Sequence, residues 1–145
     1  MNGSMTVSIC CLTYNHEKYI RQCLDGLIMQ KTEFDFEILV HDDASSDATQ
    51  SIINEYVVAY PNLIKPILQI RNQYSQGISP LRQILFPLVK GKYVALCEGD
   101  DYWTDPLKLQ KQVDFLENHP DYSLCCHMVR RINQQTGEEL KSDYI

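Results

Sequence analysis

Apolar residues along the chain follow two alternating periods. Short unbroken apolar runs predict strands buried on both faces, whereas apolar residues spaced three or four apart predict helices with one buried face. The expected strands cover residues 6–13, 36–40, 64–70, 93–97 and 123–129, with a last strand after a turn at 134–138. The expected helices cover about residues 17–29, 45–57, 79–89 and 105–116. This alternation predicts an α/β fold, a mostly parallel sheet flanked by helices in a three-layer sandwich.

Prolines adjust these boundaries. Pro66 lacks an N–H group, which places the third strand at an edge of the sheet. Pro80 suits the first turn of its helix, while Pro87 is expected to kink that helix or to end it early. Asp105 followed by Pro106 is the pattern of a helix N-cap and a first helical residue.

Composition and charge narrow the classes of partner. A chain of 145 residues suits a single domain, and the net charge of −6 argues against nucleic-acid binding because no basic stripe is available to neutralise phosphates. No apolar run approaches the roughly 20 residues of a membrane span, and the polar N-terminus does not resemble a signal peptide. We therefore expect one domain over residues 1–145, in the cytoplasm.

The six cysteines are expected to be reduced core residues. Five of them lie in apolar, strand-like runs, and Cys23 lies on the apolar face of a helix. Free cysteine behaves as a small buried hydrophobe in a reducing compartment. A zinc site is the alternative, but the chain has no Cys-x-x-Cys pair, and neighbours such as Cys125 and Cys126 would point to opposite faces of a strand.

Polar residues gather where three predicted strands end, at residues 13–15, 41–47 and 98–103. Ligands of open α/β sheets bind at the carboxyl ends of the strands. In the third segment, Glu98, Asp100 and Asp101 surround a glycine, and clustered carboxylates suit Mg²⁺ or Mn²⁺, which complete their shells with water and phosphates. The alternative is a solvated acidic loop in which Asp105 merely caps the next helix.

The other two segments offer contacts for a nucleotide. Asp43 can accept hydrogen bonds from a base or ribose, or can belong to a turn, and Ser45 and Asp47 are interpreted as turn and helix-cap residues. Tyr14 can stack on a base or simply pack. The dinucleotide fingerprint and the P-loop are both absent, so side chains and a cation are expected to hold the nucleotide. The three histidines near strand ends are interpreted as packed or solvent-facing residues: His16, His41 and His127.

Five motifs occur in the order and spacing of a known family: VSICCLTYN, ILVHDDASSDAT, NQYSQGISPLRQ, KGKYVALCEGDDYW and DPLKLQKQVDFL. To about His127 the chain resembles the family-two glycosyltransferases, which have the Rossmann-like GT-A fold. The resemblance implies an inverting hexosyltransferase that moves a sugar from a nucleotide-diphospho-sugar, expected to be a UDP-sugar, to a glycan or lipid-linked acceptor. It also implies a place in bacterial surface polysaccharide synthesis, and it allows peripheral association of the full-length enzyme with the inner face of the membrane.

The resemblance also implies roles for individual residues. Asp43 is expected to hydrogen-bond the base, and Asp100 to bind ribose or assist the cation. Asp101 is expected to ligate the Mn²⁺ or Mg²⁺ that bridges the diphosphate. The residues expected to bind the nucleotide are Thr13, Tyr14, Asn15, Glu17, Asp43, Arg82 and Asp100.

Three positions depart from the family pattern. Leu12 stands where the family often has proline, and Ala44 stands where it often has glycine. Glu98 occupies the usual first aspartate of the acidic motif, which leaves open how Glu98, Asp100 and Asp101 divide their work.

The stretch after the acidic motif is short for this family. About forty-five residues follow, and none of Asp114, Asp121 and Asp143 matches the family's catalytic base. We therefore expect a C-terminally truncated domain that binds nucleotide with little or no transfer. Two alternatives stay open: a noncatalytic nucleotide-sugar-binding module, and a metal-dependent nucleotidyltransferase, whose usual glycine-rich basic loop is missing from TYNHEKY.

Overall fold

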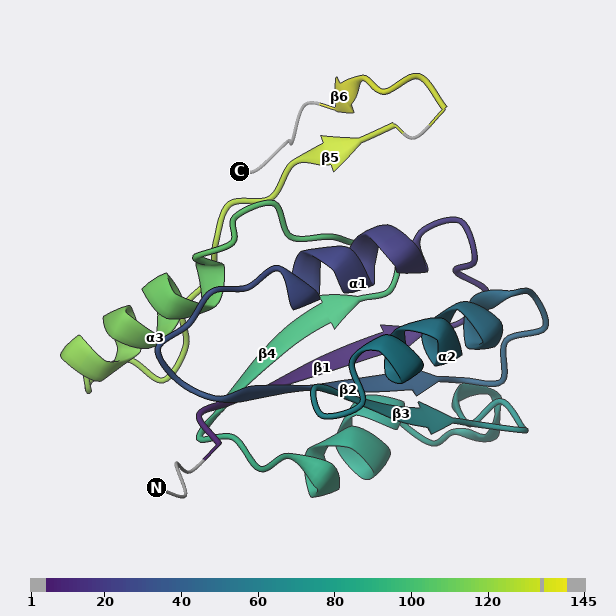
Figure 1. The fold of residues 1–145 in the computed structure, drawn as a ribbon, viewed down its shortest axis with the longest axis horizontal. Coiled ribbons are helices and arrows are strands. Elements are labelled where there is room, and N and C mark those ends of the chain that lie inside the picture. Colours follow the sequence, from purple (N-terminus) through teal and green to yellow (C-terminus); the bar gives the residue numbers. More distant parts are fainter. Residues whose placement is uncertain (1–4, 134, 141–145) are drawn as a thin grey trace. The chain divides into compact units, whose positions relative to one another are not determined.

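A parallel sheet forms the centre of the first part of the chain. The computed structural model describes residues 5–133 and 135–140. The chain divides into two compact units, residues 1–113 and 114–145, and each is described by itself. In the first unit the strands are β1 (Val7–Thr13), β2 (Phe36–Asp42), β3 (Ile64–Leu68) and β4 (Tyr93–Glu98). All paired strands are parallel and their order is β3-β2-β1-β4, so the four arrowheads point the same way (Figure 1).

Helices cover both faces of this sheet. On one face α1 (Ile20–Ile28) and α2 (Thr49–Ala59) lie side by side, and Leu109 and Val113 of α3 (Lys108–Asn118) join the same core (Figure 1). That core contains alternate residues of the strands, among them Ile9 and Ile38. The predicted α/β fold of three layers is therefore confirmed.

The opposite face carries a smaller core. Cys10 and Leu39 pack there against Leu85 of η2 (Pro80–Leu85), a π-helix that is followed by the 3-10 helix η3 (Phe86–Leu88). A third short helix, η1 (Tyr74–Gln76), lies in the loop after β3.

The prolines act as expected. Pro66 lies in β3, an edge strand, where its missing N–H costs no ladder hydrogen bond on the outer side. Pro80 begins η2. The helix expected over residues 79–89 is broken into η2 and η3, because Pro87 has no N–H to donate and its ring crowds the carbonyl one turn earlier.

The strand expected at residues 123–129 is wrong. Those residues form no strand, and the only strands in the described part of the second unit are the short antiparallel pair β5 (Arg131–Ile132) and β6 (Glu139–Leu140). Cys126 is exposed and Cys125 is half-buried, so these two cysteines are not the core residues that the pattern predicted. An apolar run becomes a buried strand only beside another strand, and the pattern does not supply one. The other four cysteines are buried as expected, and none of the six forms a disulfide.

Candidate functional site

The carboxyl ends of β1, β2 and β4 are joined by backbone hydrogen bonds. The Gly99 N–H donates to the Leu12 carbonyl at 2.7 Å, and the Asp43 N–H donates to the Thr13 carbonyl at 3.0 Å. Each bond continues the parallel pairing by one residue past the strand. The three polar segments predicted from the sequence therefore meet at one edge of the sheet.

The loop after β1 is joined side chain by side chain to the loop after β2. The Asn15 N–H donates to Ser45 Oγ at 2.8 Å, and Asn15 Oδ1 accepts from the Ser46 N–H at 2.8 Å. This reciprocal pair holds the backbone of both loops. Asn15, which was predicted to bind the nucleotide, therefore has a structural role that sequence reasoning missed.

Glu17, two residues after Asn15, makes the same kind of reciprocal pair. Its N–H donates to Asp47 Oδ2 at 3.1 Å, and its Oε2 accepts from the Ala48 N–H at 3.0 Å. Asp47 Oδ1 also accepts from the Thr49 N–H at 2.9 Å, so Asp47 stabilises the start of α2 from one residue before the N-cap, Ala48. Burial alone would raise the pKa of Asp47, but the hydrogen bonds from Thr49 and from the Glu17 N–H hold it below its usual range.

Two residues of these loops have left-handed backbone. Asn15 has φ 55° and Ala44 has φ 64°. Asparagine tolerates this region, but an alanine there meets its own Cβ clash, at a cost of roughly 1–2 kcal/mol. The positive φ explains why a glycine suits the position of Ala44 in this kind of loop.

Asp43 is buried, with only 5% of its surface exposed, and holds the loop after β3. Its Oδ1 accepts from the Gln73 N–H at 2.7 Å, and its Oδ2 accepts from the Tyr74 N–H at 3.0 Å. The Asn72 side chain donates to the Asp43 carbonyl at 3.0 Å. Each carboxylate oxygen keeps further lone pairs, so this anchoring leaves room for a contact with a base.

Asp42, beside it, turns toward α2. Its carboxylate accepts from the Ser45 N–H at 2.9 Å, from Ser45 Oγ, and from Gln50 Nε2 at 2.6 Å. Asp42 is fully buried. The two adjacent aspartates thus brace different loops, because successive strand residues point to opposite faces.

The acidic segment after β4 is placed by a close approach. A Cβ on Gly99 would lie 2.7 Å from Thr13 Oγ1 and 2.9 Å from His16 Nδ1, so only glycine fits between them. The Asp101 N–H donates to the Glu98 carbonyl at 3.0 Å, which closes a tight turn. On this turn Glu98, Asp100 and Asp101 are all exposed.

Two buried polar atoms adjoin this turn. Thr13 Oγ1 and His16 Nδ1 have no hydrogen-bond partner in the described structure. The other ring nitrogen of His16, Nε2, lies 3.9 Å from Asp100 Oδ2. Unsatisfied buried polar groups are rare and call for an explanation, for which a bound polar molecule is one candidate.

Trp103, two residues after Asp101, packs against α1 through its backbone. A Cβ on Gly26 would lie 2.8 Å from the Trp103 carbonyl oxygen and 2.9 Å from its nitrogen, so this helix meets the loop backbone directly. Trp103 is buried in the core, and Lys108 Nζ lies 3.9 Å from the centre of its ring. Trp103 is therefore a packing residue that supports the acidic turn.

Three thiols pack beneath the same turn. Cys23 Sγ lies 3.8 Å from Cys11 Sγ and 3.9 Å from Cys97 Sγ. Hydrogen bonding to a neighbouring thiol raises the pKa of Cys23 and of Cys97 far above the usual range, and burial adds to it. Cys23 and Cys97 therefore stay protonated, as buried structural cysteines do.

Tyr14 and Arg82 present their side chains to solvent. Tyr14 is 48% exposed at the end of β1, and Arg82 is exposed on η2. The element that carries Arg82, η2, is a π-helix. This conformation is rare and occurs frequently at functional sites.

Within residues 5–133 and 135–140, no group of three or more histidine, cysteine, aspartate or glutamate side chains is placed to hold a metal ion. A pair of exposed carboxylates still suits Mg²⁺ or Mn²⁺, which bind through one or two carboxylates plus substrate phosphates.

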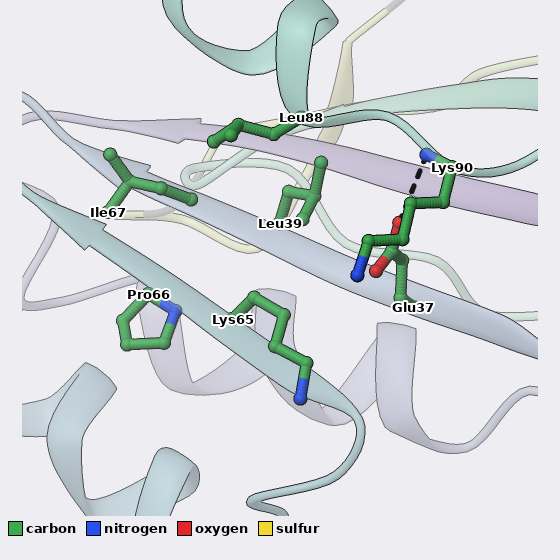
Figure 2. A pocket seen from close by; sticks show the side chains of 7 residues that line it. All are labelled: Glu37, Leu39, Lys65, Pro66, Ile67, Leu88 and Lys90. Carbon is green, nitrogen blue, oxygen red and sulfur yellow. Dashed lines mark hydrogen bonds between the residues drawn. The ribbon is translucent and has the colours of Figure 1, made fainter.

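A shallow pocket lies elsewhere, on the η3 side of the sheet (Figure 2). Its buried carboxylate, Glu37, accepts from Ser8 Oγ at 2.7 Å and from the Lys90 N–H at 3.3 Å. Glu37 is the second residue of β2, so this pocket is not part of the strand-end site. It is lined by Glu37, Leu39, Lys65, Pro66, Ile67, Leu88 and Lys90.

The fold and the strand-end site define a class of protein with solved members. The structure of Staphylococcus aureus TarS in complex with UDP-GlcNAc matches with a TM-score of 0.66 and 30% identity, covering 80% of this chain and 32% of that chain. This likeness confirms the GT-A type of α/β fold.

Sequence comparison then gives the family. The model of Glycosyl transferase family 2 matches residues 8–144, and the chain belongs to that family. Uncharacterized protein Rv1520 of Mycobacterium tuberculosis is 47% identical over 92% of this chain and 38% of its own length. The UDP-Glc:alpha-D-GlcNAc-diphosphoundecaprenol beta-1,3-glucosyltransferase WfaP of Escherichia coli is 32% identical over 77% of this chain and 41% of its own length. The chain thus spans well under half the length of these relatives.

No helix in the described part of the chain is both long and apolar enough to cross a membrane.

Proposed function

We propose that this chain is the donor-binding part of an inverting glycosyltransferase, and that it holds a UDP-sugar through Mn²⁺ or Mg²⁺ at Asp101 and Asp100. The observation that carries the proposal is the acidic turn. Its two aspartates are exposed, while its backbone is locked against the β1 loop at Gly99. Such a turn offers anionic oxygens at a fixed place without a third protein ligand, which suits a cation shared with phosphates.

The neighbouring residues fit a nucleotide beside that cation. Thr13 Oγ1 and His16 Nδ1 are buried and lack partners in the described structure, so a bound ribose or phosphate can satisfy them. Tyr14 offers an exposed ring for the base, and Asp43 offers the lone pairs that its loop contacts leave unused. Asn15 and Glu17 act indirectly, by holding the two loops in place. Arg82 is proposed to contribute positive charge near the nucleotide.

The chemistry follows from this arrangement. When bound, the cation neutralises charge on the departing nucleoside diphosphate. The residues of this chain position the donor: the acidic turn orients the diphosphate, and the loops after β1 and β2 orient the nucleoside. Transfer with inversion also needs a general base that activates an acceptor hydroxyl. Asp114 and Asp121 are exposed residues of the second unit, and Asp143 lies outside the described residues, so the base remains unassigned.

The relatives support the choice of donor. TarS has been solved with UDP-GlcNAc, and the name of WfaP gives UDP-Glc as donor and a diphosphoundecaprenol-linked sugar as acceptor. By analogy we propose a glycan or lipid-linked acceptor for the full-length protein, in polysaccharide synthesis, with the protein in the cytoplasm at the inner face of the membrane. We further propose that residues 1–145 work as one donor-binding domain.

Calorimetric titration of the chain with UDP, with and without Mn²⁺, tests the proposal. Binding is expected to need Mn²⁺ and to weaken at least about tenfold in Asp101→Ala, because a lost carboxylate ligand leaves the cation held mainly by phosphate. Asp35→Ala is the matched control, because Asp35 is exposed just before β2, at the opposite end of the sheet.

The outcomes separate the candidate functions. Metal-dependent UDP binding that Asp101→Ala weakens supports the transferase. UDP binding that is the same with and without Mn²⁺, and the same in Asp101→Ala, favours a noncatalytic nucleotide-binding module and contradicts the metal site.

A further inference from the structure

The loop after β3 carries an aromatic ring into solvent. Tyr74 is 77% exposed, a large fraction for a tyrosine, and it begins the short helix η1. An exposed aromatic ring is better suited to bind a ligand when its backbone is already ordered, because less conformational entropy is then lost on binding.

The backbone around Tyr74 is held by its own hydrogen bonds. The Gly77 N–H donates to the Tyr74 carbonyl at 3.0 Å, and the Ile78 N–H donates to the Gln73 carbonyl at 3.1 Å. Gly77 takes φ 78°, which glycine adopts at little cost and which closes the turn. Asn72 binds both ends of this turn, accepting from the Ser75 N–H at 2.8 Å and from Gln76 Nε2 at 2.8 Å.

This ordered turn is attached to the candidate base site. The Tyr74 N–H donates to Asp43 Oδ2, while the Asp43 N–H donates to the carbonyl of Thr13, the residue before Tyr14. Two exposed tyrosines are therefore tied to one buried aspartate through the backbone, Tyr74 by its own N–H and Tyr14 through the residue before it.

We propose that Tyr74 is a second aromatic wall of the donor site, which stacks on the nucleobase together with Tyr14. The inference rests on the proposed function and adds a residue that recognises the base. Every base has an aromatic face, and stacking on tyrosine removes apolar surface of both rings from water. Because the backbone of Tyr74 is already ordered, only two side-chain torsions are restricted on binding, which keeps the entropic cost low.

The test compares UDP and GDP binding in the presence of Mn²⁺ for the wild-type chain and two substitutions. Tyr74→Ala is expected to weaken nucleotide binding about 5- to 150-fold, the usual range for removal of one stacked side chain. Tyr74→Phe keeps the ring and is expected to bind within about threefold of wild type. Mn²⁺-pyrophosphate, which has no base, is expected to bind equally to all three chains.

Tyr60→Ala is the matched control. Tyr60 is 42% exposed after α2 and before β3, so it lies at the amino-terminal end of β3, whereas Tyr74 follows the carboxyl end. If Tyr74→Ala binds the nucleotide like the wild type, Tyr74 is no base contact and the inference is overturned while the donor site stands. Equal weakening of pyrophosphate binding would also overturn it, because the substitution would then act through the loop. If the wild type binds neither UDP nor GDP, the proposed function fails, and this inference fails with it.

Discussion

Replacement of Asp43 by asparagine separates the two roles that this buried side chain can have. Both carboxylate oxygens accept from backbone N–H groups, Oδ1 from Gln73 and Oδ2 from Tyr74. Asparagine keeps the shape but turns one oxygen into an NH₂ group. Whichever way the amide is oriented, one donor then faces another donor in a site that is only 5% exposed.

The size of the effect follows from the lost bond. A hydrogen bond to a charged group contributes about 1.5–3 kcal/mol, and water has little access to replace it. Opening of residues 72–77 should therefore become easier by about 2 kcal/mol, which corresponds to roughly 30-fold faster amide exchange where exchange follows local opening. The rest of the first unit should change little, because the loop adds no residue to the main core.

Hydrogen exchange of the Gln73 and Tyr74 amides, measured without nucleotide, checks this expectation. Asp35→Asn serves as the control, because Asp35 is exposed before β2. Unchanged exchange at both amides in Asp43→Asn would refute the anchoring role. A loss of UDP binding in that case would mean that Asp43 acts on the base alone.

Three further predictions concern the supports of the site. Ala44→Gly should raise the free energy of unfolding by about 0.5–1 kcal/mol in urea titrations, since glycine removes the cost of φ 64° while adding some unfolded-state entropy; a lower midpoint would contradict the strained backbone. Gly26→Ala should destabilise the chain by about 1–2 kcal/mol, because overlap with the Trp103 backbone at 2.8 Å outweighs the roughly 1 kcal/mol gain in helix propensity; stabilisation, as at an open helix position, would argue against this contact. Burial lowers the pKa of His41 below its usual 6.5, so the unfolded chain takes up a proton first and stability falls as pH drops from 6.5 through the folded pKa. His41→Leu, which also removes two buried ring nitrogens without partners in the described structure, should flatten that part of the pH–stability curve, and an unaltered slope would count against His41 as its source.

Much of the fold could be predicted from periodicity, because a strand or helix buried on a given face needs apolar residues at fixed spacings. The four parallel strands follow from this logic. The edge position of Pro66 and the start of η2 at Pro80 follow instead from the missing N–H group of proline. The error at residues 123–129 shows its limit. An apolar run indicates that burial of those residues is favourable, but it forms part of a sheet only when a neighbouring strand can pair with it.

The candidate site, like the fold, could be predicted from the sequence only in part. The positions of the polar segments could be predicted from the sequence, since parallel strands end on the same side of the sheet and polar side chains there lie outside the core. The roles of Asn15, Glu17 and Asp43 are visible only in the folded chain, because their partners lie about 30 residues away along the chain. The need for glycine at position 99 also comes from the fold, since only the folded chain brings Thr13 and His16 against it. Local propensity acts between near neighbours, whereas these contacts depend on how the strands are ordered in space.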